Sequence, residues 1–295
     1  MELLHVAIAK GQMVGPHRFV MSERSVVGNR EYAKHWPGRY TELVPLGRTQ
    51  GSYMDPIIVE SAAEPFSLEP CPPTTKLLFE RIKKASLVLA ALDLCPVVGP
   101  LCRQASVPVV YVSVYSFRTN LQILDATVPN PIRRLKRKCS MALFELRRRA
   151  EVRKAAGLQC NGTPTFTVYR RINPNTMLFF DSRVRPEMVV TPLELKRRVS
   201  QLFDGAPIRL LFSGRLIRIK GVEHLPRVAV ELRRMKVPFR MDICGGGDLE
   251  GYLREQIRSL GLSDSVHLQG VLKFRQELVP FAKTHADLFV CPHLQ

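Results

Sequence analysis

The segments IRLLFSGR at residues 208–215 and FRMDICGGGD at residues 239–248 indicate the architecture of this chain. Each begins with a largely apolar run typical of a buried strand and reaches glycine at the end of that run. Between them, apolar residues recur every three or four positions from Val222 to Leu232, which predicts a helix. A second helix is predicted at 249–260, ending at Gly261, and a third at 277–283 lies between strands at 266–268 and 287–291. Strands that alternate with helices predict βαβ units and a parallel sheet.

The chemistry at the carboxyl ends of these strands indicates a phosphate site, because parallel sheets bind ligands there. Glycines let backbone N–H groups approach an anion, and a helix N-terminus adds a partial positive charge. Two of the strand ends carry Gly214-Arg215 and Gly245–Gly247. Arg215 offers a planar guanidinium that fits a diphosphate, and Lys220 adds an ammonium on a flexible stem.

Two common phosphate-binding motifs are missing from the sequence. A dinucleotide fingerprint that used Gly245 and Gly247 would need glycine at position 250, where the chain has Glu250. No G-x-x-x-x-G-K-[ST] motif is present either, so a P-loop ATPase is not indicated.

The order and spacing of these residues resemble the donor-binding half of GT-B glycosyltransferases, specifically the retaining family 4 group. The resemblance covers residues 208–292. Its matching positions are Ser213–Leu216, Lys220-Gly221, Leu225, Ala229, Pro238-Phe239, Gly245–Gly247, Leu249, Leu253, Leu260–Leu262, Val266, Gly270 and Ala286–Pro292.

The resemblance implies an α/β protein with two Rossmann-like domains that face each other across a cleft, and a nucleotide-sugar as the donor substrate. It implies that Gly214, Arg215 and Lys220 bind the donor diphosphate. It further implies no cofactor and no bound metal. The nucleotide itself would contact Gly245, Gly246, Gly247, Leu249, Val271 and Leu272.

In the family, the chain continues past this last strand into a loop with an acidic E-x7-E motif that handles the donor sugar and ribose. This sequence stops at Gln295, before any such motif. The resemblance therefore implies a C-terminally incomplete protein with a truncated second domain. We expect such a chain not to be a competent enzyme by itself.

The first half of the chain has a less regular pattern. Strands are predicted at 3–9, 41–46, 56–60, 87–90 and 107–114, and helices at 77–84 and 97–104. The rest of 22–78 reads as irregular, with a proline-rich surface loop at 64–75, and Gly11 and Gly15 read as loop residues. We expect a Rossmann-like acceptor domain at 1–186, an interdomain connection at 187–206 and the donor domain at 207–295.

The strand at 107–114 is followed by polar residues. In a GT-B enzyme this strand end faces the cleft. The resemblance therefore implies that the acceptor contacts Tyr115, Ser116, Arg118 and Asn120. An ordinary polar loop with a helix cap accounts for them equally well. The sequence assigns no catalytic residue.

The net charge is +18, and much of it comes from residues 133–154, where ten Lys or Arg accompany two Glu. This segment predicts a basic helix with an apolar stripe of Leu135, Cys139, Ala142, Leu143 and Leu146. Such a helix can pack on the domain with a solvated face, lie on anionic lipid, or bind nucleic acid. Only one aromatic residue, Phe144, lies among the basic ones and no recognition motif is present, which argues against nucleic acid.

Cysteine usage and hydropathy indicate the cellular compartment in which we expect the protein. The seven cysteines are dispersed and never spaced as C-x-x-C, which favours reduced thiols over a disulfide framework or a zinc site. No run of 18 apolar residues predicts a transmembrane helix. We therefore expect a cytoplasmic protein, with peripheral contact at the inner face of the membrane through 133–154.

The resemblance implies a retaining hexosyltransferase that moves a sugar from a nucleotide diphosphate to an acceptor hydroxyl. Polysaccharide or glycolipid biosynthesis, with a lipid-linked acceptor, fits the basic helix. One alternative is a non-catalytic basic Rossmann-like protein that binds a nucleotide, a membrane surface or nucleic acid. Another is a different enzyme on the same fold, such as a nucleotide-sugar epimerase.

Overall fold

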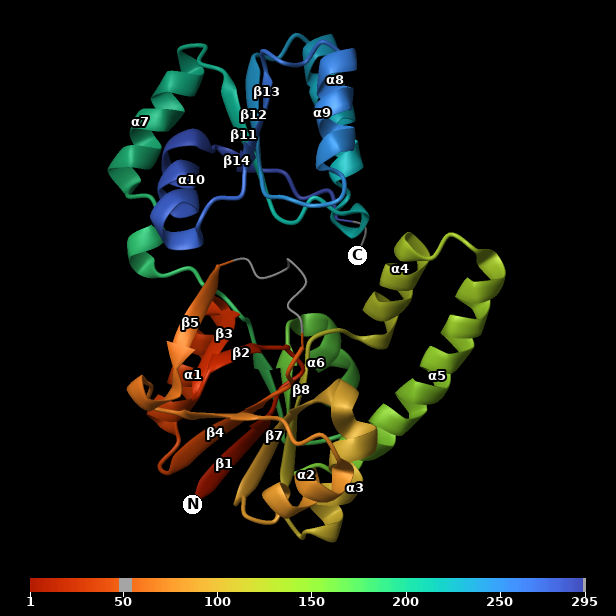
Figure 1. The fold of residues 1–295 in the computed structure, drawn as a ribbon. Helices are drawn as coiled ribbons and strands as arrows, with labels where there is room; N and C mark the ends of the chain where they lie inside the picture. Colours follow the sequence, from red (N-terminus) through yellow and green to blue (C-terminus); the bar gives the residue numbers. More distant parts are fainter. Residues whose placement is uncertain (48–54, 294–295) are drawn as a thin grey trace. The chain divides into compact units, whose positions relative to one another are not determined.

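The computed structural model describes residues 1–47 and 55–293, and the chain forms two compact units (Figure 1). The first unit comprises 1–120 and 135–182, and the second comprises 121–134 and 183–295. The main division thus falls near the expected boundary at 186. Residues 121–134, which the sequence pattern placed in the first domain, group with the second unit.

The first unit is built on a seven-stranded parallel sheet in the order β10-β9-β8-β7-β1-β4-β6. A smaller antiparallel sheet has the order β2-β3-β5. The parallel strands are β1 (Glu2–Val6), β4 (Arg39–Val44), β6 (Ser67–Pro70), β7 (Leu87–Ala91), β8 (Val109–Ser113), β9 (Gly157–Asn161) and β10 (Thr176–Phe179). The antiparallel strands are β2 (Gln12–Gly15), β3 (Arg18–Ser22) and β5 (Pro56–Glu60).

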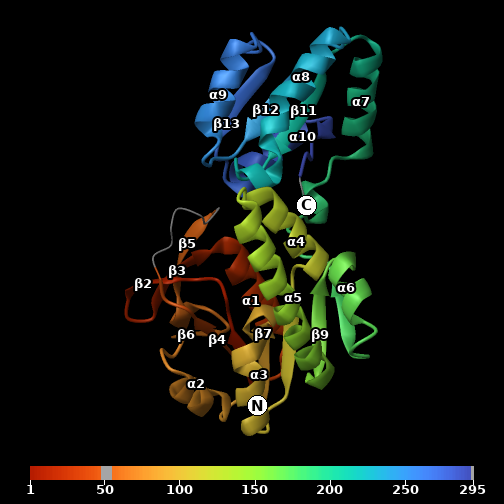
Figure 2. The same ribbon diagram turned by 90° about the vertical axis from the view of Figure 1, so that its right-hand side faces the viewer.

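Apolar side chains alternate between the two faces of the parallel sheet, so each face has its own core. One core joins the sheet to α2 (Thr75–Ile82), α3 (Cys95–Gln104), α5 (Pro131–Lys154) and α6 (Thr163–Tyr169). The other joins it to α1 (Glu23–His35) and the antiparallel sheet. Figure 2 shows α3 and α5 in front of the parallel strands. Helix α4 (Phe117–Thr127) follows β8.

Helix α1 corrects the expectation that residues 22–78 are largely irregular. Ser22 caps it by accepting a hydrogen bond from the Ser25 N–H at 3.2 Å. Only Val26 and Asn29 are buried on this helix, so its apolar stripe is too narrow to show helical periodicity. The same stretch contains β6, inside the expected loop at 64–75. Gly15 ends β2 and Gly11 forms an isolated bridge with Leu46, so neither is a simple loop residue.

The second unit is built on a four-stranded parallel sheet in the order β13-β12-β11-β14. Its strands are β11 (Ile208–Ser213), β12 (Phe239–Cys244), β13 (Val266–Gly270) and β14 (Leu288–Phe289). Strands β11 and β12 pair in register from Ile208 with Phe239 to Ser213 with Cys244. Both strands have the predicted bounds, whereas β14 is shorter than the predicted 287–291.

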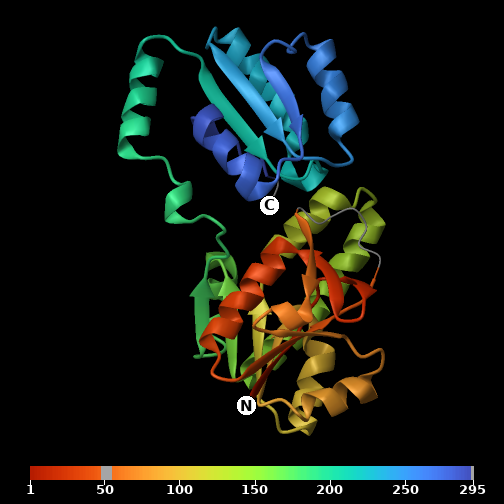
Figure 3. The same cartoon turned by 60° about the vertical axis from the view of Figure 1, so that its left-hand side comes forward.

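Helices cover both faces of this second sheet. Helices α8 (Leu225–Arg234) and α9 (Glu250–Ser259) bury their apolar stripes in one core with β11, β12 and β13. Figure 3 shows α7 (Pro192–Phe203) and α10 (Val279–His285) on the opposite side of the sheet from α9. Gly261 ends α9 in the left-handed conformation with φ 61°, as its position in the sequence predicts.

A buried polar chain crosses the first unit between β1, α1 and β4. The ring nitrogen Nδ1 of His5 lies 3.0 Å from the Tyr40 hydroxyl, which donates to Asn29 Oδ1 at 2.9 Å. Asn29 in turn donates its amide hydrogen to the carboxyl group of Glu42. Burial raises the pKa of Glu42 to about 7, although the hydrogen bond from Asn29 acts in the opposite direction.

We predict that Glu42→Gln stabilises the protein at alkaline pH. The pKa of Glu42 is higher in the folded chain than its ordinary 4.5. The contribution of Glu42 to the free energy of unfolding is therefore greatest at low pH and is lost as the pH rises through 7. At about 1.4 kcal/mol per pKa unit, the variant should gain on the order of 3 kcal/mol at pH 8 and much less at pH 5. Denaturant unfolding at both pH values measures this gain.

The matched control is Glu31→Gln, which changes an exposed carboxylate on the same helix as Asn29. Its effect on the free energy of unfolding should be small at both pH values. A Glu42→Gln effect that is equal at pH 5 and pH 8 would contradict the prediction.

Candidate functional site

The loops that follow β11 and β12 lie against each other, and backbone hydrogen bonds join them into one edge. Gly214 donates its N–H to the carbonyl of Cys244 at 3.0 Å, and Leu216 donates to Gly246 at 3.0 Å. Leu249 donates to Leu216 at 2.9 Å. We call residues 214–220 and 245–249 the β11–β12 edge. The sequence placed both of its parts at strand ends, and the structure brings them into direct contact.

The glycines of this edge are needed for that contact. A Cβ atom at Gly245, where φ is 137°, would lie 1.9 Å from the carbonyl oxygen of Gly214. A Cβ atom at Gly247, where φ is 156°, would lie 2.6 Å from the carbonyl oxygen of Leu216. Both glycines therefore have a structural reason to be glycine, in addition to the nucleotide contact predicted for them.

The segment after β13 reaches the same edge. Gly245 donates its N–H to the carbonyl of Gly270 at 2.6 Å. A Cβ atom at Gly246 would lie 3.1 Å from a methyl group of Val271, whose side chain is 62% exposed. The structure thus brings Val271 to the glycine turn and places half-buried Leu272 next to it in the chain.

Leu249 and the start of α9 complete this part of the edge. The half-buried side chain of Leu249 packs against the core, while its backbone belongs to the edge. Helix α9 begins at Glu250, directly after the glycine turn. The positive end of its dipole is therefore close to the turn, although Glu250 itself pairs with Arg254 at 3.0 Å.

Arg215 and Lys220 are neighbouring cations with no carboxylate partner among residues 1–47 and 55–293. Lys220 ends a 3-10 turn at Arg218–Lys220, and burial lowers the pKa of its ammonium. The positive charge of Arg215 lowers that pKa further, while Cys291 acts in the opposite direction. Two adjacent positive charges without a counter-charge favour the binding of an anion.

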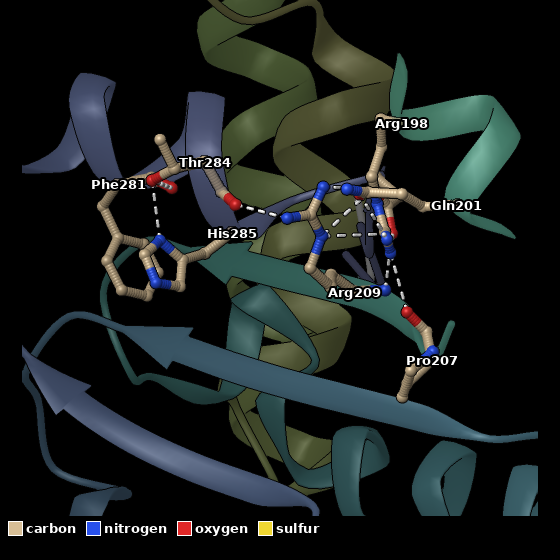
Figure 4. A network of polar contacts seen from close by, with 8 residues as sticks. Arg198, Gln201, Pro207, Arg209, Phe281, Thr284 and His285 are labelled. Carbon is tan, nitrogen blue, oxygen red and sulfur yellow. Dashed lines mark hydrogen bonds and ion pairs between the residues drawn. The ribbon is translucent and has the colours of Figure 1, made fainter. Parts of the chain in front are cut away.

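Strand β14 is held beside β11 by the carboxylate of Asp287. Arg198 of α7 contacts both carboxylate oxygens at 2.6 Å, and Arg209 of β11 donates its backbone N–H at 2.8 Å and its guanidinium at 2.9 Å (Figure 4). Burial alone would raise the pKa of Asp287, but these hydrogen bonds outweigh it and hold the pKa well below its usual range.

This anchor also determines where the chain goes after β14. Val290 donates its N–H to the carbonyl of Leu211 at 2.8 Å. Two residues later, the backbone of Pro292 meets Gly221, where a Cβ atom would lie 1.9 Å from the Pro292 carbonyl oxygen. The end of β14 therefore lies against the turn that carries Lys220.

The residues predicted to contact an acceptor belong to the first unit, at the end of β8 and the start of α4. Ser116 is buried, and its hydroxyl accepts a hydrogen bond from the Thr119 N–H at 3.1 Å. Ser116 therefore caps α4, which is the role that the sequence offered as the alternative to acceptor contact. Tyr115 and Arg118 are exposed and Asn120 is half-buried, and their contact with an acceptor stays a prediction.

Helix α5 has the expected extent but an unexpected orientation. Its buried residues are Glu145, Arg148 and Val152, whereas the apolar stripe predicted from the sequence faces solvent. Leu135, Leu143 and Leu146 are 64–65% exposed. Glu145 is hydrogen-bonded by the Tyr169 hydroxyl at 3.0 Å, which explains how this carboxylate tolerates burial.

Arg148 is one of the ten basic residues of 133–154, and the predicted apolar stripe did not include it. It is 3% exposed, and its guanidinium lies 3.4 Å from the Tyr115 carbonyl and 3.7 Å from Glu145. Arg148 thus supports the loop after β8. The spacing of Glu145, Arg148 and Val152 along one helical face is the signal that could have revealed this inner face.

Metal clusters and membrane-spanning helices are both absent from the described residues. There, no group of three or more His, Cys, Asp or Glu is arranged to hold a metal ion. Across the same ranges, no helix combines the length and apolarity that crossing a membrane requires.

We predict that Gly245→Ala disrupts the β11–β12 edge. The new methyl group meets the Gly214 carbonyl and forces a residue other than glycine to adopt a positive φ, so the melting temperature should fall by several degrees. The control is Gly251→Ala in helix α9, where a Cβ atom meets nothing within 4 Å. That change should stabilise the protein by about 1 kcal/mol. Equal effects of the two substitutions would contradict the structural role assigned to Gly245.

Comparisons with known proteins agree with this architecture. Residues 194–295 match the sequence model of the family described as glycosyl transferases group 1. A search of the curated proteins found no significant match. Among solved structures, HepE from Anabaena in complex with UDP is similar, with a TM-score of 0.61 and 14% identity. That similarity covers 98% of this chain and 73% of HepE.

Two enzymes of lipopolysaccharide synthesis are also similar in structure. The outer core galactosyltransferase WaaB in its apo form has a TM-score of 0.61 at 10% identity, covering 99% of this chain and 74% of WaaB. The glycosyltransferase WaaG has a TM-score of 0.55 at 12% identity, covering 99% of this chain and 75% of WaaG. The chain therefore has the GT-B fold of these glycosyltransferases, and its residues 194–295 match the group 1 glycosyl transferase family.

Proposed function

We propose that this chain belongs to a glycosyltransferase that moves a sugar from a nucleotide-diphosphate donor to an acceptor hydroxyl. The observation that carries the proposal is the pair of Arg215 and Lys220, two cations without a carboxylate partner in the described residues. They lie on the glycine-lined β11–β12 edge, inside the segment that matches the group 1 family. A dianionic diphosphate supplies the counter-charge that this pair lacks.

The same two cations account for the chemistry. As the bond between the sugar and the diphosphate breaks, negative charge accumulates on the leaving phosphate oxygens. Arg215 can bind two of these oxygens at once, and Lys220 adds a point charge, so both stabilise the departing group. Gly214 leaves room for the diphosphate. The nucleotide would contact Gly245, Gly246, Gly247, Leu249, Val271 and Leu272.

The finer details of the proposal rest on the family resemblance. They are a hexosyl donor, a retaining outcome, and no metal or cofactor besides the nucleotide-sugar. HepE was solved with UDP, which makes uridine nucleotides the first ligands to test. On the acceptor side, Tyr115, Arg118 and Asn120 remain candidates, whereas the buried cap Ser116 is the weakest.

We predict that Arg215→Ala and Lys220→Ala each weaken the binding of UDP, GDP or ADP by about tenfold or more, because charge-assisted hydrogen bonds contribute about 1.5–3 kcal/mol. The measurement is isothermal titration calorimetry, supported by the ligand-induced rise in melting temperature. Arg227→Ala, which changes an exposed arginine on α8, is the control and should bind like the parent. Binding that is indifferent to Arg215 and Lys220 but falls steeply with salt would instead indicate a nucleic-acid binder.

We also propose that helix α5 lies on an anionic membrane surface at the inner face of the membrane. Leu135, Leu143 and Leu146 are exposed on a helix whose basic residues are mostly exposed as well. Such a helix can insert its leucines among acyl chains while arginine and lysine contact anionic headgroups. This contact would bring the protein to a lipid-linked acceptor in glycolipid or polysaccharide synthesis.

We predict that the double variant Leu143→Asp, Leu146→Asp reduces binding to vesicles that contain phosphatidylglycerol by at least about tenfold, because it removes two apolar side chains from the lipid contact. Co-sedimentation measures binding, with phosphatidylcholine vesicles as the uncharged comparison. Leu77→Asp, at an exposed leucine of α2, is the matched control and should bind like the parent. Equal binding by all three proteins would reject a role for α5.

A further inference from the structure

The segment after strand β14 brings a histidine to the Arg215 and Lys220 pair. The Pro292 carbonyl packs on Gly221 so closely that only glycine fits there. Lys220 directly precedes Gly221 and His293 directly follows Pro292, so this backbone contact sets the two basic side chains beside each other. His293 is half-buried rather than directed freely into solvent.

The surroundings of His293 are positively charged. The charged and titratable neighbours of this cluster are Lys220 from the 3-10 turn, Arg215 from the loop after β11, and Cys291 from the same segment as His293. No carboxylate within the described ranges pairs with His293. The acidic residue of the next turn, Glu223, lies 3.7 Å from Arg218 instead.

We infer that His293 is a third basic group of the Arg215 and Lys220 site and donates a hydrogen bond to the diphosphate of the nucleotide-sugar. This inference rests on the function proposed above and adds a residue to its donor site. Three nitrogen donors, two from the loop after β11 and one from the segment after β14, can surround a diphosphate from more than one direction. Arg215 and Lys220 carry a positive charge before the ligand binds, and His293 can become protonated when it binds.

Binding is then linked to protonation. In the unliganded chain, burial and then the positive charge of Lys220 lower the pKa of His293, so the imidazole is neutral at pH 7. A bound diphosphate brings negative charge and favours the imidazolium, so the pKa of His293 rises on binding. The complex therefore takes up a proton, and affinity increases as the pH falls through this range.

The test is calorimetric titration of the 295-residue chain with UDP-glucose at pH 8, 7 and 6, in buffers of different ionisation enthalpy. A nucleotide-sugar is used because its diphosphate, unlike that of UDP, has no group that titrates in this range. Affinity should rise about five- to tenfold from pH 8 to pH 6, since a histidine pKa that is about one unit higher in the complex strengthens binding about tenfold. The buffers reveal the proton taken up.

Two variants identify the group responsible. His293→Gln keeps a hydrogen-bond donor but cannot titrate, so its affinity should change less than about twofold between pH 8 and pH 6. His285→Gln removes an exposed histidine of α10 in the same unit and should keep the pH dependence of the parent. A pH dependence that persists in His293→Gln, or that is absent from the parent, would overturn the inference while leaving the proposed function intact.

Failure of the proposed function has a different signature. GDP-mannose and ADP-glucose are titrated in the same way if UDP-glucose does not bind. A folded chain that binds none of the three at any pH would overturn the donor site itself, and the role of His293 with it.

Discussion

The β11–β12 edge depends on one close approach, between the backbones of Gly214 and Gly245. No side chain fits between them, and the hydrogen bonds of Gly214 to Cys244 and of Leu216 to Gly246 form only at that separation. The contact aligns the ends of β11 and β12 into a single edge, and through Gly270 it draws the segment after β13 onto the same edge. A glycine-rich turn thus acts first as a packing element, which leaves its backbone available to a ligand.

The charges of the second unit show why this edge is suited to an anion. The structural charges of this unit are paired. Asp287 forms ion pairs with Arg198 and Arg209, and buried Asp242 forms an ion pair with Arg240 at 3.0 Å. Arg215 and Lys220 have no such partner in the described residues, and burial followed by the charge of Arg215 lowers the pKa of the lysine. Unpaired charge next to a partly desolvated backbone costs free energy, and a bound diphosphate would recover it.

In the first unit, α5 buries the side chains that its sequence would place outside. Glu145 and Arg148 are tolerated inside because Tyr169, the Tyr115 carbonyl and each other supply partners. The leucines that a soluble helix would normally bury remain on the outer face among basic residues. This inversion is the observation on which the proposed membrane contact rests.

Local sequence was sufficient for much of the fold. The apolar runs of β11 and β12 and the glycine that ends α9 were recognisable because strand alternation, helical periodicity and a left-handed cap are properties of neighbouring residues. Helix α1 could not be recognised in this way because only two of its residues are buried. Only the tertiary structure revealed three features: the inner face of α5, the capping role of Ser116 and the position of His293 beside Lys220. They depend on contacts between segments far apart in the chain, and short-range periodicity carries no information about those.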